Sequence, residues 1–453
     1  MSETIVKENK MGVMPIPKLL ISMSLPMIIS MLVQALYNIV DSIFVAQLNE
    51  AALTAVSLVF PVQNLMIAVA SGTGVGINAL LSRSLGEKRI DEANKIASNG
   101  VFLALCSSVI FAILGIVGSR LFFEFQTDDV QIIEYGTQYM SIITIASLFI
   151  FLQITYERLL QSTGKTIFNM ITQTTGAVIN IILDPILIFG WFGLPAMGVI
   201  GAAVATITGQ FIAVLLAVFF HNKYNKEIVV KARGFKPEGR VIGNIYKIGV
   251  PSILMQSIGS VTTFALNNIL LMFSSTAATV FGVYFKLQSF IFMPVFGLTN
   301  GMIPIVAYNY GARNKKRIYD TLKLSILIAV SIMAIGVLVF QLWPKTLLGL
   351  FDASETMIAI GVPALRTISL SFIFAGFCII SSSMFQALGN GVYSLIMSMC
   401  RQLFVIIPVA YVFAITIGLD AVWFSYPIAE IVSVTICIIL LKKIINEKVK
   451  HLN

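Results

Sequence analysis

The chain has 453 residues, of which 57% are hydrophobic and 11% are charged, and its formal net charge is +9. Because about a quarter of the residues in a soluble domain are charged, this composition excludes a soluble globular protein and indicates a polytopic membrane protein. The positive charge does not indicate nucleic-acid binding, since the cations collect in short loops between apolar runs.

Twelve apolar runs predict twelve transmembrane helices, since about 20 apolar residues cross a bilayer as a helix. The runs are continuous, as a spanning helix requires, and do not alternate as a spanning strand would. The predicted fold class is therefore an all-α polytopic membrane protein. Its helices are expected to begin near residues 17, 51, 96, 131, 166, 196, 241, 275, 319, 357, 391 and 420.

The loops between these runs alternate in charge. The intervening loops are mostly acidic, whereas cations dominate the C-terminal tail and the segments RSLGEKRIDEANK (83–95), HNKYNKEIVVKARGFKPEGR (221–240) and GARNKKRIYD (311–320). Loops rich in lysine and arginine stay on the cytoplasmic side of a membrane. Both termini are therefore predicted to be cytoplasmic.

The two halves of the chain repeat each other at one constant offset. The same separation along the chain relates the pairs Pro26 and Pro251, Gln63 and Gln288, Gly76 and Gly301, Gln161 and Gln386, and Gly164 and Gly389. This duplication predicts two pseudo-symmetric six-helix bundles, an N-lobe (1–221) and a C-lobe (245–453), joined by a basic cytoplasmic linker (222–244). Since six is even, both copies insert in the same orientation, as in some secondary transporters.

Four acidic residues fall inside the predicted spans, namely Asp41, Glu157, Asp184 and Glu430. A charge at the middle of the membrane costs at least about 2.5 kcal/mol, so each is a candidate functional residue.

Asp41 and Asp184 lie at similar depth, each with an asparagine about one helical turn before it, Asn38 and Asn180 respectively. Oxygen ligands suit Na⁺, and a carboxylate shielded from water suits H⁺. The pair thus predicts a cation or proton site, although the two aspartates could instead only hydrogen-bond neighbouring helices.

The C-terminal copy lacks this pair. At the offset that relates Pro26 to Pro251, it carries Leu266 in place of Asp41 and Val409 in place of Asp184. The coupling chemistry is therefore expected in the first half alone.

The other charges in the spans leave alternatives open. Glu157 and Arg158 could each form a structural ion pair with another partner or line an inward-facing substrate pocket. Lys286 and Arg401 are expected to balance Glu430 or each other.

Three segments together resemble the multidrug and toxic compound extrusion (MATE) family. They are SLPMIISMLVQALYNIVDSIFV (24–45), NIILDPILIFG (180–190) and MGVIGAAVATITGQ (197–210). The aspartate in the first segment is similar to that of the DinF branch, and the overall pattern resembles the MepA-like exporters of Gram-positive bacteria. The resemblance covers essentially the whole chain.

This resemblance implies two six-helix lobes in a V and the export of small lipophilic or cationic drugs in exchange for H⁺ or Na⁺ by alternating access. It implies a cation or proton site in the N-lobe formed by Asp41, Asn180, Asp184 and Thr206. Na⁺ would bind to the first three of these residues. Pro26 would allow the first helix to bend.

Candidate residues for a substrate cavity are Gln34, Asn38 and Glu157. A monomer in the bacterial cytoplasmic membrane is expected, with no cofactor and no ATPase domain on the chain.

Two other classes of function compete. A lipid-linked oligosaccharide flippase has the same two-lobe architecture, but it would favour a strongly cationic cavity, and here the charges within the spans are mixed. An intramembrane enzyme is disfavoured because both histidines, His221 and His451, lie outside the spans and no nucleophile motif is present. The chain is therefore predicted not to be an enzyme.

Overall fold

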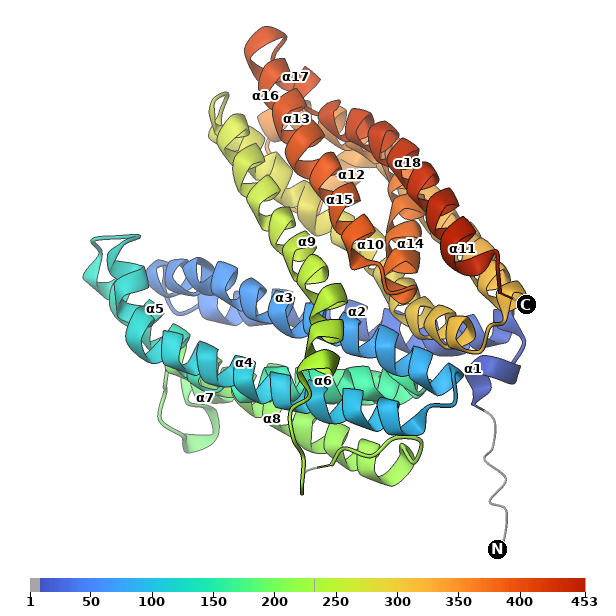
Figure 1. Cartoon of the computed structure of the whole chain (residues 1–453). Coiled ribbons are helices and arrows are strands. Elements are labelled where there is room, and N and C mark those ends of the chain that lie inside the picture. The colour runs from blue at the N-terminus through green and yellow to red at the C-terminus, as the bar shows by residue number, and fades with distance from the viewer. Residues whose placement is uncertain (1–8, 232, 453) are drawn as a thin grey trace, which may run out of the picture. The chain divides into compact units, whose positions relative to one another are not determined.

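Helices and their connections make up the part of the chain that the computed structural model describes, residues 9–231 and 233–452, in which no strand occurs (Figure 1). The predicted all-α class is confirmed. The two termini, predicted to be cytoplasmic, lie outside the described residues.

The long helices of the first half follow one another with short connections. They are α2 (Ile16–Ala46), α3 (Glu50–Gly86), α4 (Ile90–Glu124), α5 (Val130–Ile145), α6 (Ser147–Ser162), α7 (Thr166–Phe189) and α8 (Val199–Tyr224). A short helix α1 (Lys10–Val13) precedes them, and a 3₁₀ turn η1 (Trp191–Gly193) separates the last two.

The second half repeats this order. Its long elements are α9 (Gly239–Leu271), α10 (Ser275–Gly311), α11 (Lys315–Leu342), α13 (Glu355–Ser369), α14 (Phe372–Ala387), α15 (Gly391–Met399), α16 (Ile407–Thr416) and α18 (Ser425–Ile444). The π-helical turn η2 (Cys400–Ile406) joins α15 to α16 without a break. The short elements are α12 (Pro344–Gly349), α17 (Leu419–Val422) and η3 (Ile445–Val449).

The number of spans comes close to the twelve predicted from the apolar runs. Among the described residues, nine helices are individually long and apolar enough to cross a membrane, counting α15 to α16 as one. Two bent pairs, α5 with α6 at 44° and α13 with α14 at 48°, raise the count to eleven. Helix α18 is the twelfth long helix in chain order.

The duplication is visible in the helix bounds. Helix α3 (50–86) and helix α10 (275–311) are separated at both ends by the same offset that relates Pro26 to Pro251. The same offset separates both ends of α6 (147–162) from those of α14 (372–387). The two bent pairs occupy equivalent places in the two halves. The two copies therefore share one pattern of helices.

The chain forms two units that exchange the beginnings of their first helices. Among the described residues, one unit contains those up to Ile28 together with those from Val250 onward, and the other contains those of Ile29–Gly249. The predicted lobe boundaries at residues 221 and 245 describe the duplication of the sequence, whereas the spatial units change partner inside α2 and inside α9. Pro26 and Pro251 lie close to these two exchange points.

Close backbone contacts explain the exchange. A Cβ atom added at Gly297 of α10 would lie 2.6 Å from the Cα atom of Ile28 in α2, and the Ser24 hydroxyl donates to the Leu298 carbonyl oxygen at 3.3 Å. In the other unit, a Cβ atom at Gly76 of α3 would collide with the carbonyl oxygen of Ile245 in α9. Small residues allow membrane helices to approach in this way.

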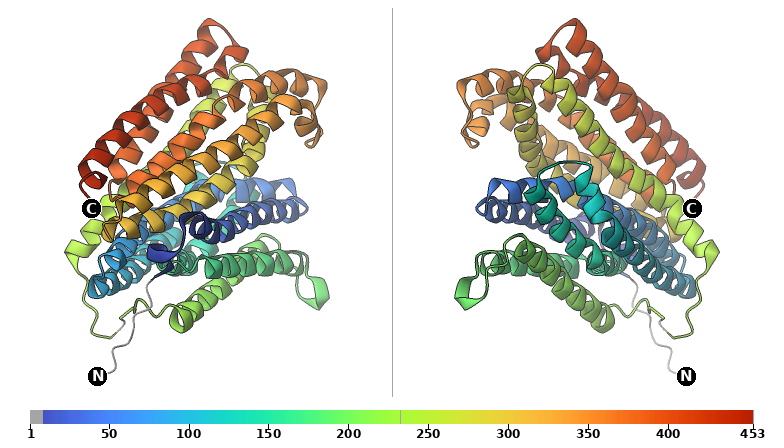
Figure 2. Two further views of the ribbon diagram at one scale, coloured as in Figure 1. Left: turned by 90° about the vertical axis from the view of Figure 1, so that its right-hand side faces the viewer. Right: turned by 90° about the vertical axis from the view of Figure 1, so that its left-hand side faces the viewer.

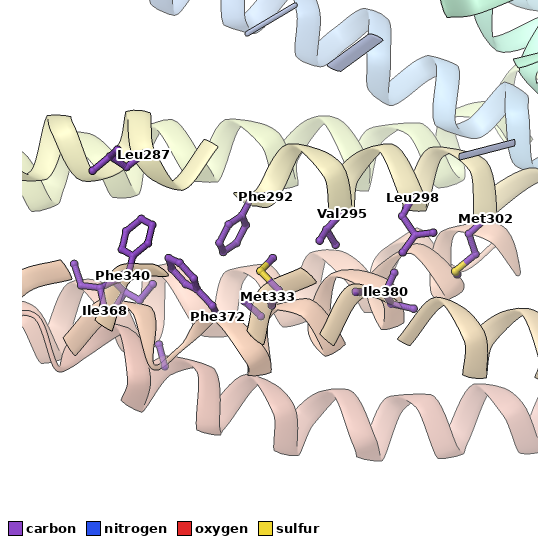
Figure 3. Close-up of a cluster of buried hydrophobic side chains, with 14 of the residues drawn as sticks. Leu287, Phe292, Val295, Leu298, Met302, Met333, Phe340, Ile368, Phe372 and Ile380 are labelled. Atoms are coloured by element: carbon purple, nitrogen blue, oxygen red, sulfur yellow. The ribbon is translucent and has the colours of Figure 1, made fainter. Parts of the chain in front are cut away.

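Aliphatic and aromatic side chains together fill the core of the unit that contains most of the second half (Figure 3). The ring of Phe372 in α14 lies 5.2 Å from the rings of both Phe292 in α10 and Phe340 in α11. Met333 lies in the same cluster. These edge-on contacts fix α10, α11 and α14 against one another.

Candidate functional site

Helices α7 and α8 approach each other at a pair of glycines. A Cβ atom added at Gly209 of α8 would lie 2.6 Å from the carbonyl oxygen of Gly176 in α7. The two helices run side by side (Figure 2). Asn180 lies one turn after Gly176, and Thr206 lies three residues before Gly209, so this approach brings the two polar side chains together.

Asn180 connects the two helices by hydrogen bonds. With the amide oriented to satisfy its neighbours, Asn180 Nδ2 donates to Asp184 Oδ2 at 3.0 Å. Asn180 Oδ1 then accepts hydrogen bonds from the backbone nitrogen and the hydroxyl of Thr206, at 2.9 and 3.2 Å. Asp184 is completely buried, so it depends on this amide for part of its hydrogen bonding.

Asp41 of α2 completes the group. Its carboxyl lies within hydrogen-bonding reach of the Asp184 carboxyl. Each aspartate has one buried oxygen, Oδ1, that has no hydrogen-bond partner among the described residues. Two adjacent carboxylates repel, so a proton or a cation between them would relieve both the repulsion and the missing contacts.

Three further polar side chains extend this group, two of them by interacting with the aspartates and the third through Tyr139. Tyr37, one turn before Asp41 in α2, lies within hydrogen-bonding reach of Thr206. Tyr139 of α5 is buried, and Gln63 of α3 donates to its hydroxyl at 3.3 Å. The interpretation of the sequence missed these three residues. Tyr37 could have been found from its position one turn before Asp41, but nothing in the local sequence marks Tyr139.

Glu157 lies in a different environment. It is 3% exposed, and its carboxyl accepts hydrogen bonds from Gln153 Nε2 at 3.0 Å, Thr172 Oγ1 at 3.2 Å and Gln173 Nε2 at 2.7 Å. It forms no ion pair within the described part of the chain. The neighbouring Arg158 donates from Nη1 to Gln161 Oε1 at 2.7 Å.

The remaining predicted residues are dispersed. Gln34 and Asn38 are exposed on α2, so they are not part of the buried group. Pro26 is buried in the same helix, about four helical turns before Asp41.

Arg401 and Glu430 form a salt bridge of 2.7 Å, as expected for a structural pair. The predicted balance of these two charges is confirmed, whereas Lys286 lies over the ring of Phe351, 5.9 Å from its centroid.

The ligand chemistry of the aspartate group fits a monovalent cation and not a transition metal. No group of three histidine, cysteine, aspartate or glutamate side chains that could hold a metal ion occurs in the described residues. The available atoms are the oxygens of two carboxylates, one amide and one hydroxyl, which are ligands for a hard cation. A proton shared by the two carboxyls would satisfy the same group.

Comparison with known families gives two matches on this chain. The MatE family model matches residues 26–186 and again residues 251–412. The two matches begin at the equivalent prolines Pro26 and Pro251, so they follow the internal repeat. Together they cover more than half of the chain.

Curated relatives align over most of their length. A multidrug export protein MepA from Staphylococcus haemolyticus is 29% identical over 416 residues, covering 92% of this chain and 91% of the relative. A MepA from Staphylococcus aureus strain MRSA252 is 28% identical over 418 residues, again covering 92% and 91%.

Solved structures agree in fold. A multidrug resistance MATE family transporter of the MOP superfamily in its outward-facing conformation has a TM-score of 0.91 at 27% identity, covering 97% of this chain and 98% of that chain. A MOP superfamily transporter from Pyrococcus furiosus gives the same score, identity and coverage, and a reverse polarity of its binding pocket is taken to suggest a different function for that protein.

Proposed function

Because the chain belongs to the MATE family of membrane transporters, we propose that it is a secondary active multidrug efflux antiporter that exchanges lipophilic organic cations for H⁺ or Na⁺. The similarity to multidrug export proteins over nine-tenths of the chain supports the choice of substrate. The coupling ion would bind between Asp41 and Asp184.

The contrast between two kinds of buried carboxyl carries this assignment. Both oxygens of Glu157 accept hydrogen bonds, so this group is satisfied by its neighbours. Asp41 and Asp184 instead lie side by side, and each has an unpartnered buried oxygen among the described residues. A buried polar atom without a partner calls for an explanation, and a transported cation supplies one.

Coupling follows from the charge of the aspartate pair. When external H⁺ or Na⁺ binds, the pair is neutralised, and this state favours release of the organic cation to the outside. When the ion leaves to the cytoplasm, the carboxylates favour the inward-facing state that loads substrate. Alternating access requires only that each ligand binds the two states with different affinity.

Pro26 would link the aspartate pair to the movement of α2. A proline inside a helix removes one backbone hydrogen bond, which makes bending at that point easier. Pro26 lies close to the point at which α2 passes from one unit to the other. A change of charge at Asp41 would therefore act on the same helix that bends.

The same proposal extends to the membrane in which the protein lies, its oligomeric state and its orientation. It would lie in the bacterial cytoplasmic membrane as a monomer with both termini in the cytoplasm, which agrees with the basic loops of the sequence. Candidate residues for the substrate cavity are Gln34, Asn38 and Glu157. No cofactor is required, since the ion gradient drives transport.

Gradient-driven efflux from proteoliposomes tests this function. A fluorescent lipophilic cation would be loaded, and either a pH gradient or a Na⁺ gradient imposed. We expect one gradient to accelerate efflux, which identifies the ion. Asp184→Asn and Asp41→Asn should abolish the acceleration, because an amide cannot change charge.

Glu50→Gln is the matched control, since Glu50 is exposed at the start of α3 and should behave as wild type. Normal gradient-driven transport by folded Asp41→Asn and Asp184→Asn proteins would refute the coupling role. If folded wild-type protein transports the cation under neither gradient, the lipid-linked oligosaccharide flippase becomes the better assignment, to be tested with a fluorescent lipid.

A further inference from the structure

Three sulfur-containing side chains meet in the unit that contains most of the second half. Cys378 of α14, Met397 of α15 and Cys437 of α18 form one buried cluster, with exposed fractions of 2%, 5% and 0%. The Cys437 thiol donates to the Met397 thioether at 2.8 Å, and Cys378 packs in the same cluster. The three helices pack against one another.

We propose that Cys378, Met397 and Cys437 form a binding site for the soft monovalent ion Cu(I). Thiolate and thioether sulfurs are preferred ligands of Cu(I). A structural zinc site usually has four nitrogen or sulfur ligands, and this cluster offers three ligands, one of which is a thioether. The number and the type of the ligands therefore favour Cu(I) over zinc.

The surroundings of the cluster suit such a complex. Cu(I) held by two thiolates carries a net charge of −1, which requires a nearby positive charge. Arg401 interacts electrostatically with Cys378, and its Nε is buried without a hydrogen-bond partner among the described residues. Its Nη1 pairs with Glu430, whose negative charge also acts on Cys378, so the unpartnered Nε is the donor left to face the thiolates.

The cluster can adjust to a bound ion. Cu(I) would separate the Cys437 and Met397 sulfurs, which are in direct contact without it. Methionine has three rotatable bonds, so its thioether can move without displacing α15. A bound ion would then join α14, α15 and α18 through one centre. The site is independent of the aspartate group, which lies in the other unit.

Competition for Cu(I) tests the proposal on the full chain. Purified, reduced protein would be titrated without oxygen against Cu(I) held as its bathocuproine disulfonate complex, whose colour reports the remaining complex. Wild-type protein should remove one equivalent of Cu(I). Cys378→Ser/Cys437→Ser should remove none under the same conditions, and Met397→Leu should bind at least about tenfold more weakly.

The chain supplies a matched control, because its other two cysteines lie outside the cluster. Cys106→Ser/Cys400→Ser removes the same number of thiols and should bind as wild type. Size-exclusion elution would confirm that each variant is folded. The proposal is overturned if folded wild-type protein removes no Cu(I), or if the Cys378→Ser/Cys437→Ser protein binds as well as the Cys106→Ser/Cys400→Ser protein.

Discussion

Asp184 lies inside α7 without any exposed surface, and the side chains around it decide what this carboxyl can do. Asn180 gives it one hydrogen bond, and Asp41 is its acidic neighbour. Glu157, equally buried, has three neutral donors instead. The two carboxyl groups are therefore expected to respond differently to removal of their charge.

Glu157→Gln tests this difference at the level of one residue. The amide nitrogen introduced at this position would face donors instead of accepting from them, and a buried donor left unpaired costs about 1–3 kcal/mol. We expect a lower melting temperature in detergent but gradient-driven transport with the same coupling ion. Asp184→Asn should show the opposite behaviour, with normal melting and no coupling. Loss of coupling in a stable Glu157→Gln protein would instead assign this residue to the coupling site.

At the scale of the helix, the approach of α7 and α8 positions Asn180 and Thr206. Gly209→Ala would place a Cβ atom 2.6 Å from the Gly176 carbonyl oxygen, which must push the helices apart. Overpacking of this kind costs about 1–3 kcal/mol. We expect a lower melting temperature together with weaker coupling, because the Asn180 bonds to Thr206 lengthen.

Gly282→Ala is the control for this change. Gly282 also lies inside a long helix, but beyond the backbone of that helix and the two neighbouring residues no described atom lies within 4 Å of an added Cβ atom. This variant should match wild type in melting and in transport. If both alanine variants behave alike, the close approach of α7 and α8 has no role in the site.

Pro26→Ala tests bending of α2. Alanine restores the backbone donor that proline lacks, which makes the straight helix more favourable. A shift of about 1.4 kcal/mol in a barrier changes a rate about tenfold, so we expect a clear fall in drug efflux at unchanged folding. The measurement is the initial efflux rate under the active gradient. The control is Pro61→Ala, at an exposed proline inside α3, which should leave that rate unchanged. Equal efflux rates for the two variants would exclude a hinge at Pro26.

The helices could be predicted well from the sequence because an apolar run is a local signal and the repeat presents that signal twice. The predicted starts deviate where a helix extends beyond the apolar run. Helix α4 begins at Ile90, ahead of the predicted position near 96, because its first turn carries Asp91 and Glu92 and hydropathy does not detect it. Such acidic residues favour a helix N-terminus, so capping rules contain the missing signal.

The candidate site could be predicted only in part. Asp41, Asn180 and Asp184 were found because acids and amides are rare within membrane spans, and Thr206 was found through the family resemblance. Tyr139 and Gln63 come from α5 and α3, and no spacing along the chain connects them with the aspartates. Contacts of this kind depend on how helices pack, which a single sequence does not reveal.

At the scale of the whole molecule, the exchange of first-helix segments ties the two halves together. The described residues up to Ile28 pack with the second half, and Asn309 donates to the Met11 carbonyl oxygen at 3.0 Å. The residues of α9 up to Gly249 pack with the first half. We therefore expect the halves to remain associated when the linker is cut.

A protease site inserted after the exposed Gly234 tests this expectation. After cleavage in mild detergent, an affinity tag on the C-terminal fragment should retain the N-terminal fragment through size-exclusion chromatography. Separation of the fragments would contradict the exchange. The uncut protein carrying the same insertion is the control for effects of the insertion itself.

The exchange also has a consequence for the origin of the chain. Two copies that each lend the start of their first helix to the other have the arrangement of a domain-swapped homodimer, here joined into one polypeptide. In a true homodimer every substitution appears twice. Fusion removes that restriction, so one copy could retain acidic residues at positions 41 and 184 while the other changed to Leu266 and Val409. An ancestor with two ion sites could thereby have become a transporter with one.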